Sequence, residues 1–342
     1  MPRIVQFHRL GGPEVLEIED VPSSEPSSGE VTLRVQAIGL NRAESMFMHG
    51  YYLEPPRLPA RLGYEASGTV TAIGPDVDPR WLYKSVSTIP AFSPNRYGVL
   101  GTEVIVPVHA LGEYPSHLTA IEATSIWMQY MTAYGALVEL GRLKKGEFAL
   151  ITAASSSVGV AAIQTVRAEG AVSIATTRTG AKRDELLALG ADHVVVTDEE
   201  DVVSRVRDIT GGAGARIIFD PIAGPLLGQL AQAAALGAMI VECGWLSVAD
   251  TPFPLVPALQ KALTIRGYWL AETTITDPER FARAKSYVYE RVNTGEFKPK
   301  VAKTFPFDAV VEAYRYMESN EQIGKIVLTV GRHEPILKGD MR

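Results

Sequence analysis

The stretch Phe148-Ala-Leu-Ile-Thr-Ala-Ala-Ser-Ser-Ser-Val-Gly159 decides the fold. Its first five residues are a short apolar run typical of a buried strand, and a helical pattern begins directly after the small residues of the turn. Such a turn presents backbone N–H groups and a positive helix end to a pyrophosphate. We therefore expect a dinucleotide to be bound by the turn residues Ser155, Ser156, Ser157, Val158 and Gly159.

The glycine pattern of this turn is incomplete. A dinucleotide fingerprint places glycine at three positions, which here hold Ala154, Ser156 and Gly159. Small residues still allow the backbone to approach the phosphates. A plain turn between a strand and a helix is the alternative at this point, so other features have to decide.

The chain on both sides of the turn alternates between strand and helix patterns. Compact apolar runs at 148–152, 172–176, 193–196, 216–220 and 238–242 are separated by amphipathic segments at 158–170, 182–190, 200–212 and 225–237. This alternation is typical of a parallel sheet with helices on its faces. The prediction for this region is an α/β fold with a Rossmann-type, doubly wound parallel sheet.

The first third of the chain has a different texture. Short strand patterns at 31–38, 68–74 and 102–108 are punctuated by Gly, Pro and Asn, which indicates an irregular, mainly antiparallel barrel. Helical patterns at 278–292 and 307–319 and a last strand at 324–330 are expected to complete this first domain. The predicted organisation is a catalytic domain at 1–127, completed by 266–342, and a nucleotide domain at 128–265.

The end of the second nucleotide-domain strand indicates which cofactor is used. An enzyme that uses NAD places a carboxylate there, on the ribose 2′-hydroxyl. This chain has Thr177, Arg178 and Lys182 instead, a cationic and hydrogen-bonding group that suits a 2′-phosphate. The sequence therefore favours NADPH, with a solvated basic loop as the alternative.

Composition excludes several classes of protein. The chain has 342 residues, 46% of them hydrophobic and 21% charged, with a net charge of −6, as in an ordinary folded protein. Its Lys and Arg residues are scattered, so we expect no nucleic-acid partner. No run approaches the roughly 18 apolar residues of a membrane span, and the start lacks an apolar signal core. A cytoplasmic protein acting on a small molecule is expected.

Cysteine and histidine usage argues against a bound metal. Cys243 is the single cysteine, which excludes an intrachain disulfide and suits a reducing compartment. The six histidines form no pair three or four residues apart, so a ligand set would have to be assembled by folding. No metal is expected. Cys243, a lone cysteine at a strand end, is interpreted as a small buried packing residue rather than as a redox thiol.

Five motifs give the chain a family resemblance. They are residues 39–44 (GLNRAE), 51–52 (YY), 62–70 (LGYEASGTV), 127–135 (WMQYMTAYG) and 324–328 (GKIVL). In order and spacing the chain resembles, over nearly its whole length, the zinc-independent quinone oxidoreductases and enone reductases of the medium-chain dehydrogenase/reductase superfamily. The resemblance implies a GroES-like barrel domain, a Rossmann NADPH-binding domain and a homodimer.

The resemblance also implies roles for individual residues. In zinc-containing relatives a Cys and a His hold the metal at the positions of Asn41 and Tyr64, so it implies that the catalytic zinc is missing here. It places Thr132, Cys243 and Gly244 near the nicotinamide. It also places Thr197 near the adenosine and Lys325 at the C-terminal edge of the cleft. The family has two adjacent glycines where this chain has Ser156 and Ser157.

The expected reaction is metal-free, NADPH-dependent reduction of a quinone or an activated C=C bond, as in an enone. Negative charge then develops on the substrate oxygen, which hydrogen-bond donors stabilise. Asn41 and Tyr52, with Tyr64 as a third, are the candidate donors by motif match. Two alternatives stay open for these residues: Asn41 can be a turn residue, and the tyrosines can be packing anchors. The proton can come from a tyrosine or from solvent.

Two alternative functions stand beside this expectation. One is a zinc-type alcohol dehydrogenase, which requires stoichiometric zinc despite the missing ligands. The other is a non-catalytic NADPH-binding sensor, suggested by the serine-rich turn, because fold alone does not establish catalysis.

Overall fold

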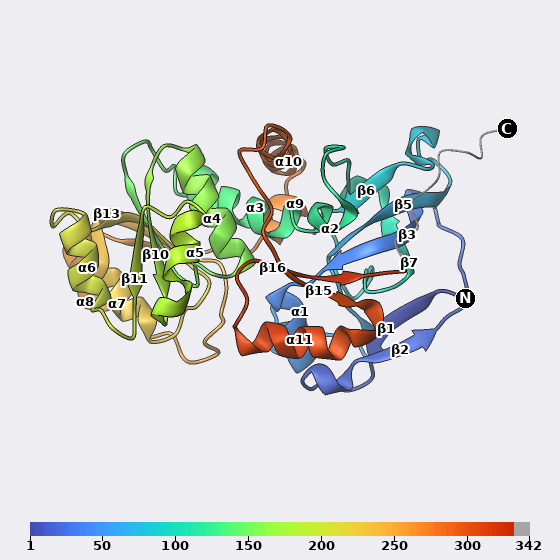
Figure 1. The fold of residues 1–342 in the computed structure, drawn as a ribbon, viewed down its shortest axis with the longest axis horizontal. Helices are drawn as coiled ribbons and strands as arrows, with labels where there is room; N and C mark the ends of the chain where they lie inside the picture. The colour runs from blue at the N-terminus through green and yellow to red at the C-terminus, as the bar shows by residue number, and fades with distance from the viewer. Residues whose placement is uncertain (332–342) are drawn as a thin grey trace.

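Two large β-sheets lie one beyond the other along the long axis of the molecule (Figure 1). The computed structural model describes residues 1–331. One sheet is built from the middle of the chain, and the other combines the N-terminal part with the last strands. The chain therefore begins in the sheet of the N-terminal part, forms the sheet of the middle region, and returns to the N-terminal sheet with its last strands.

The sheet of the middle region is parallel and six-stranded. Its strands run in the order β11 (His193–Val196), β10 (Val172–Thr177), β9 (Phe148–Ile151), β12 (Ala215–Asp220), β13 (Ala234–Glu242) and β14 (Thr264–Gly267). The order reverses between β9 and β12, which is the switch point of a doubly wound fold. The predicted Rossmann-type sheet is confirmed.

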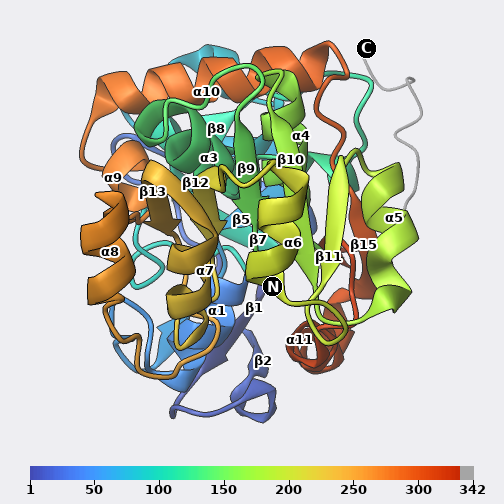
Figure 2. The same cartoon turned by 90° about the vertical axis from the view of Figure 1, so that its left-hand side faces the viewer.

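Helices cover both faces of this sheet (Figure 2). They are α3 (Trp127–Ala133), α4 (Ser157–Ala168), α5 (Arg183–Ala188), α6 (Val202–Ile209), α7 (Leu226–Ala233) and α8 (Leu255–Lys261), with a π-helix at Tyr134–Leu140. Side chains of successive strand residues point to opposite faces of the sheet. Ile217 belongs to the core under α3 and α4, and Ile218 belongs to the core under α6 and α7. That alternation explains why the central strands carry apolar residues that point to both faces.

The second sheet has seven strands and is mainly antiparallel. Its order is β15 (Val301–Pro306), β16 (Lys325–Thr329), β3 (Glu30–Gly39), β5 (Glu65–Ile73), β6 (Ser85–Thr88) and β8 (Leu111–Gly112), with β7 (Glu103–Pro107) pairing β3. A small sheet of β2 (Glu17–Asp20), β1 (Arg3–Phe7) and β4 (Ala60–Arg61) adjoins it. These strands belong to the GroES-like part of the predicted fold.

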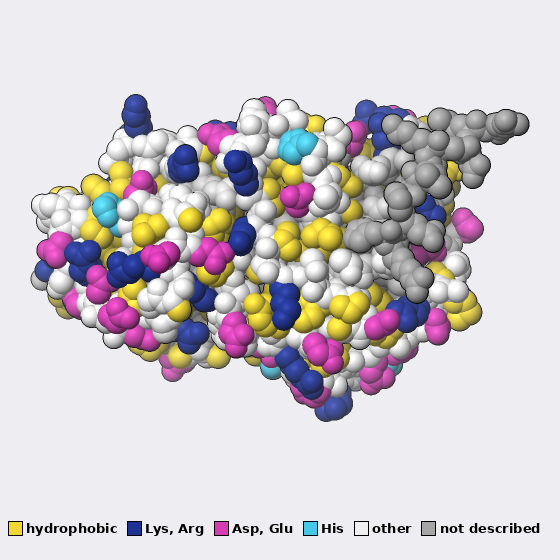
Figure 3. Space-filling view, viewed as in Figure 1, with side chains coloured by type: hydrophobic (Ala, Val, Ile, Leu, Met, Phe, Trp, Pro, Cys, Tyr) yellow, Lys and Arg dark blue, Asp and Glu magenta, His cyan; other side chains and the backbone are white. Residues whose placement is uncertain are grey.

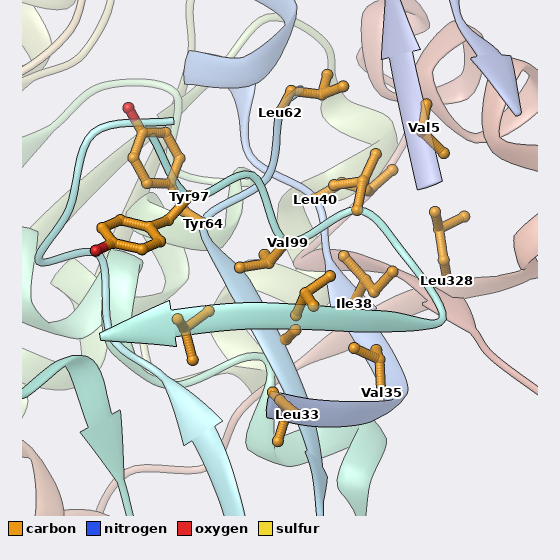
Figure 4. Packing of buried hydrophobic residues seen from close by; sticks show 14 of the residues in the cluster. Val5, Leu33, Val35, Ile38, Leu40, Leu62, Tyr64, Tyr97, Val99 and Leu328 are labelled. Carbon is orange, nitrogen blue, oxygen red and sulfur yellow. The ribbon is translucent and has the colours of Figure 1, made fainter. Parts of the chain in front are cut away.

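A buried aliphatic cluster fills this second region (Figure 4). Leu33 and Val35 of β3 contribute to it, and Leu328 of β16 closes it from the C-terminal segment. Figure 4 shows Tyr64 and Tyr97 at one edge of the cluster, with their hydroxyl oxygens turned away from the aliphatic side chains. The last strand therefore shares one core with the N-terminal part.

Five further helices connect and cover the two parts. They are α1 (Arg42–His49), α2 (Ala120–Ala123), α9 (Ala271–Thr274), α10 (Pro278–Asn293) and α11 (Val310–Ser319). The buried face of α10 packs in the core under α3. The predicted domain boundaries at 127/128 and 265/266 stay predictions, and β14 continues two residues beyond the second of them.

One predicted element was wrong in extent. The helix expected at 225–237 ends at Ala233, and β13 begins at Ala234, before the positive-φ Gly237. The run Ala233-Ala-Ala-Leu-Gly237 favours a helix locally, but pairing with β12 makes it a strand, with a register shift between Ala215 and Ile217. Tertiary pairing has overridden helix propensity here.

Residues 1–331 contain no helix with the length and apolarity that crossing a membrane requires. The face of the molecule shown in Figure 3 carries both signs of charge intermixed, with no stripe of Lys and Arg.

Candidate cofactor and substrate cleft

A cavity of about 1160 Å³ runs between the two sheet regions. It contains most of the residues expected at the site: Asn41, Tyr52, Thr132, Ser155, Ser156, Ser157, Val158, Thr177, Arg178, Lys182, Thr197, Cys243 and Gly244. Tyr64, Gly159 and Lys325 lie outside its lining. The cavity is large enough for a dinucleotide and a small substrate together. The functional roles of these residues stay predictions.

The turn at the N-terminus of α4 forms the middle of the cavity wall. Ser156 is the N-cap, and its Oγ accepts from the backbone N–H of Gly159 at 3.1 Å. Ala153 has a φ of +44°, a left-handed conformation that glycine adopts more easily. The tight turn of the fingerprint is thus formed without its first two glycines, and the first N–H groups of α4 face the cavity.

Gly159 has a packing role that the fingerprint explains. A Cβ at this position would lie 2.5 Å from the carbonyl oxygen of Ala153 and from Cα of Ala154. The last fingerprint glycine allows helix and strand to pack closely. Gly159 therefore sets the position of α4, and its contact with a cofactor stays a prediction.

The basic residues lie at the β10–β11 end of the cavity. Within residues 1–331, the Arg178 side chain makes no hydrogen bond or ion pair with the protein, and it is exposed. The Lys182 ammonium donates to Ser155 Oγ at 3.2 Å and to the carbonyls of Asn320 and Gln322 at 2.7 and 3.1 Å. Burial and the charge of Arg178 lower the pKa of Lys182. Arg178 is therefore the free cation of the pair.

Contacts across the cleft tie the phosphate turn to the C-terminal segment. The N–H of Gly324 donates to the Ser155 carbonyl at 3.0 Å, and Ser156 forms an isolated β-bridge with Gly324. Gly324 has a φ of +100°, and a Cβ there would meet the Lys300 carbonyl at 2.4 Å. This glycine permits the close packing of the start of β16 against Lys300, next to the contact with the phosphate turn.

At the opposite end of the cavity, Tyr52 is the best-placed donor. Its hydroxyl accepts from Trp269 Nε1 at 3.2 Å. Burial raises the pKa of Tyr52, and hydrogen bonds with Trp269 and Tyr64 lower it in part. Burial and the contact with Tyr52 raise the pKa of Tyr64. Because Trp269 donates to the Tyr52 oxygen, the Tyr52 hydroxyl keeps its own proton for a ligand.

Asn41 is more constrained than the sequence suggested. Its Nδ2 donates to the Gly39 carbonyl and to Glu44 Oε1, both at 3.2 Å, and its Oδ1 accepts from the Lys325 ammonium. Both amide hydrogens are therefore engaged inside the protein. As the N-cap of α1, Asn41 fits the turn-residue alternative that the sequence left open.

Lys325 lies beneath the cavity in a buried polar cluster. Its side chain is 1% exposed, and its ammonium donates to Glu65, Asn41 and Gln129. A second buried carboxylate, Glu44, accepts from Tyr314 at 2.6 Å. This position supports an architectural role for Lys325, which joins β16 to the N-terminal sheet.

Sequence reasoning did not select two carboxyl residues of this region, Asp220 and Glu242. They are the last residues of β12 and β13 and are direct neighbours across the sheet. Glu242 and its neighbour Cys243 line the cavity, and burial raises the pKa of the Cys243 thiol well above its usual value. The signal was available, because two adjacent parallel strands both end in a carboxyl residue.

One group of possible metal ligands occurs within the described chain. His8, Glu17 and Glu19 come together through the pairing of β1 and β2, and His8 Nε2 lies 2.7 Å from Glu19 Oε1. This group is on the outer surface and does not line the cavity. At the family's zinc-ligand positions, Asn41 is bound to protein groups and Tyr64 lies behind Tyr52, so the residues present do not fit a catalytic zinc.

A doubly wound sheet joined to an antiparallel domain, with a phosphate-binding turn in the cleft between them, defines a dinucleotide-binding protein of two-domain type. Two family models match the chain. The alcohol dehydrogenase GroES-like domain matches residues 27–90, and the zinc-binding dehydrogenase model matches residues 157–289.

Solved structures match along the whole chain. Quinone oxidoreductase of Escherichia coli, solved in complex with NADPH, is 28% identical, with a TM-score of 0.87 over 96% of this chain and 100% of that one. A structure described as an NAD-dependent alcohol dehydrogenase is 30% identical, with a TM-score of 0.83 over 96% of this chain and 100% of that one. The chain belongs to the medium-chain dehydrogenase/reductase superfamily and is similar to its quinone oxidoreductases, as predicted.

A curated relative places the same unit inside a much longer protein. This relative, from the phenolphthiocerol/phthiocerol polyketide synthase of Mycobacterium tuberculosis, is 30% identical over 336 residues, or 97% of this chain. The chain spans 15% of the length of that relative.

Proposed function

We propose that the protein is an oxidoreductase that uses NADPH, without a metal, to reduce a quinone or the activated C=C bond of an enone. The observation that carries the proposal is the cavity itself. It joins Arg178, whose side chain has no partner among residues 1–331, to the phosphate-binding turn and the Tyr52 hydroxyl in one continuous space. NADPH supplies the hydride, so no nucleophilic side chain is required.

The cofactor fits the residues that line this space. Arg178 presents a free guanidinium to the 2′-phosphate, and the hydroxyls of Thr177 and Thr179 belong to the same end of the cavity. The N-terminus of α4 faces the pyrophosphate. At the far end, Gly244 lets the chain after β13 pack closely on the chain after β12, because a Cβ there would meet the Pro221 carbonyl at 2.7 Å. NADPH therefore lies with its adenosine over β10 and its nicotinamide over β12–β14.

On the substrate side, Tyr52 donates its proton in a hydrogen bond to the oxygen on which negative charge develops. Trp269 Nε1 donates to the Tyr52 oxygen and fixes its position. Tyr51 and Trp245 form an edge-to-face pair across the mouth, with ring centroids 6.2 Å apart. These aromatic side chains exclude water from the nicotinamide end and favour a flat, conjugated substrate.

Turnover tests this function most directly. NADPH oxidation by simple quinones and by α,β-unsaturated ketones and aldehydes should be measured in parallel with NADH and with added zinc. Turnover that prefers NADPH and is unchanged by zinc supports the proposal. A requirement for zinc would favour an alcohol dehydrogenase instead.

A homodimer is part of the proposal. The strand β14 is an open edge of the parallel sheet, and α8 beside it exposes apolar side chains at Leu255, Val256 and Leu259, the last with 73% of its surface accessible. Open sheet edges and apolar faces are normally covered. A second copy that docks on β14 and α8 would cover both.

A further inference from the structure

Two carboxyl groups stand side by side where β12 and β13 end at the cleft. Asp220 and Glu242 are register partners in the parallel sheet. Asp220 is fully buried, and both carboxyl oxygens of Glu242 are shielded from solvent although the residue lines the cavity. Two buried carboxyl groups in contact do not both ionise readily.

The hydrogen bonds of the pair are unequal. Asp220 Oδ1 accepts from the Thr152 hydroxyl and from the N–H of Ile222 at 2.9 Å, and Oδ2 accepts from the N–H of Ala223 at 3.1 Å. The oxygens of Glu242 receive no hydrogen bond from a donor group among the described residues. Donors stabilise a charged carboxylate, so Asp220 carries the negative charge and the proton stays on Glu242.

No cation among residues 1–331 pairs with Glu242. Burial, together with the charge of Asp220, raises the pKa of Glu242 to about 8. The register partner of Glu242 in β14 is Gly267, which has no side chain. The hydroxyl of the next residue, Tyr268, bonds Thr273. The neighbouring thiol of Cys243 stays protonated, because burial raises its pKa.

The remaining charges near β14 are paired with one another. Arg266 bonds Glu272, and Arg280 bonds both Glu272 and Glu139. Hydrogen bonds from the two arginines outweigh burial and lower the pKa of Glu272. Glu242 is therefore the carboxyl group of this cavity that holds a proton near neutral pH.

The position of Asp220 and Glu242 in the sheet puts the shared proton beside the half of the fold that binds the second mononucleotide. In a doubly wound fold the second mononucleotide half lies beyond the switch point, which here means over β12, β13 and β14. The inference rests on the proposed function, under which the nicotinamide occupies this half. The nicotinamide ring is neutral in NADPH and positively charged in NADP⁺.

We propose that Glu242, sharing one proton with Asp220, distinguishes the two redox states of the bound cofactor: the pair keeps its proton beside the neutral ring and releases it to solvent beside the cationic ring. Attraction between a carboxylate and a cation is strong in a shielded site. Ionised Glu242 then stabilises the positive charge that develops on the ring as the substrate is reduced.

The test is the pH dependence of binding of NADP⁺ and NADPH, measured by calorimetry or fluorescence titration. Glu242 must lose its proton when NADP⁺ binds, so NADP⁺ affinity should rise about twenty-fold between about pH 6.5 and 8.5, while NADPH affinity lacks this rise. Both cofactors carry the 2′-phosphate, so its titration cancels in the comparison. At about pH 7, NADP⁺ binding in weak buffer should release close to one proton per site.

Glu242→Gln should abolish both the proton release and the difference between the two pH profiles. The matched control is Glu272→Gln, which removes a carboxylate from the same cavity and should leave the difference intact. Equal pH profiles for the two cofactors in the unmodified protein, or proton release that survives in Glu242→Gln, would overturn this inference. Failure of both cofactors to bind at every pH would instead overturn the proposed function.

Discussion

Arg178 is the residue that should decide cofactor choice. Its guanidinium has no partner in the described part of the chain, so removing it costs no internal contact. We expect Arg178→Ala to weaken NADPH binding by about 1.5–3 kcal/mol, the range for hydrogen bonds to charged groups, and to leave NADH nearly unchanged. Affinities of the two cofactors, titrated side by side, check this. Equal losses for both would remove Arg178 from the 2′-phosphate site.

Tyr52 should act on the rate rather than on cofactor binding. Loss of one preorganised donor to a developing oxyanion lowers kcat by about 10²–10³-fold, and we expect Tyr52→Phe to fall in this range with NADPH affinity unchanged. Tyr97→Phe is the control, because its hydroxyl bonds Glu30 outside the cavity. Full turnover of Tyr52→Phe with every substrate would show that the hydroxyl is not the donor.

At the scale of single elements, the packing of α4 on β9 depends on Gly159. A Cβ there would overlap the backbone of Ala153 and Ala154, so Gly159→Ala should lower the free energy of unfolding by about 1–3 kcal/mol and weaken NADPH binding. Gly228→Ala in α7 is the control: its Cβ meets nothing, and helix propensity predicts a gain of up to about 1 kcal/mol. Denaturant unfolding measures both. Similar stability of the two variants would contradict the packing role.

Much of the element pattern could be predicted because the central strands of the parallel sheet each contain a compact apolar run. β10, β11 and β12 lie within a residue of their expected ranges. The strand β14 was missed, since Thr264 and Arg266 give it no apolar run, and its place comes from pairing with β13. Helix α7 was predicted too long because the residues after Ala233 favour a helix locally but pair with β12 as a strand.

The candidate site was predictable where a residue's role follows from its position on a strand or turn. Serines in the phosphate turn and Arg178 at a strand end are such cases. Asn41 is different, since its engagement by Lys325 joins residues 284 positions apart. No sequence pattern shows whether an amide hydrogen is already bonded. Hydrogen bonds between residues so far apart in the sequence can be seen only in the folded structure.

For the whole molecule, the exposed edge at β14 and α8 predicts association. We expect Leu259→Asp to shift sedimentation from a dimer toward a monomer, because a charge would be buried at the contact. Leu187→Asp is the control: Leu187 is an exposed leucine of α5, which packs at the β11 end of the same sheet. A dimer that persists in Leu259→Asp and is lost in Leu187→Asp would place the interface elsewhere.

We expect the cleft between the two domains to carry out NADPH-dependent reduction of a conjugated carbonyl substrate. The most direct measurement follows NADPH absorbance in the presence of quinones and α,β-unsaturated ketones, with NADH and added zinc as parallel conditions. We predict steady turnover with at least one of these substrates, preference for NADPH over NADH, and no response to zinc. Tight NADPH binding without oxidation by any substrate would contradict the claim and identify the protein as a cofactor-binding sensor.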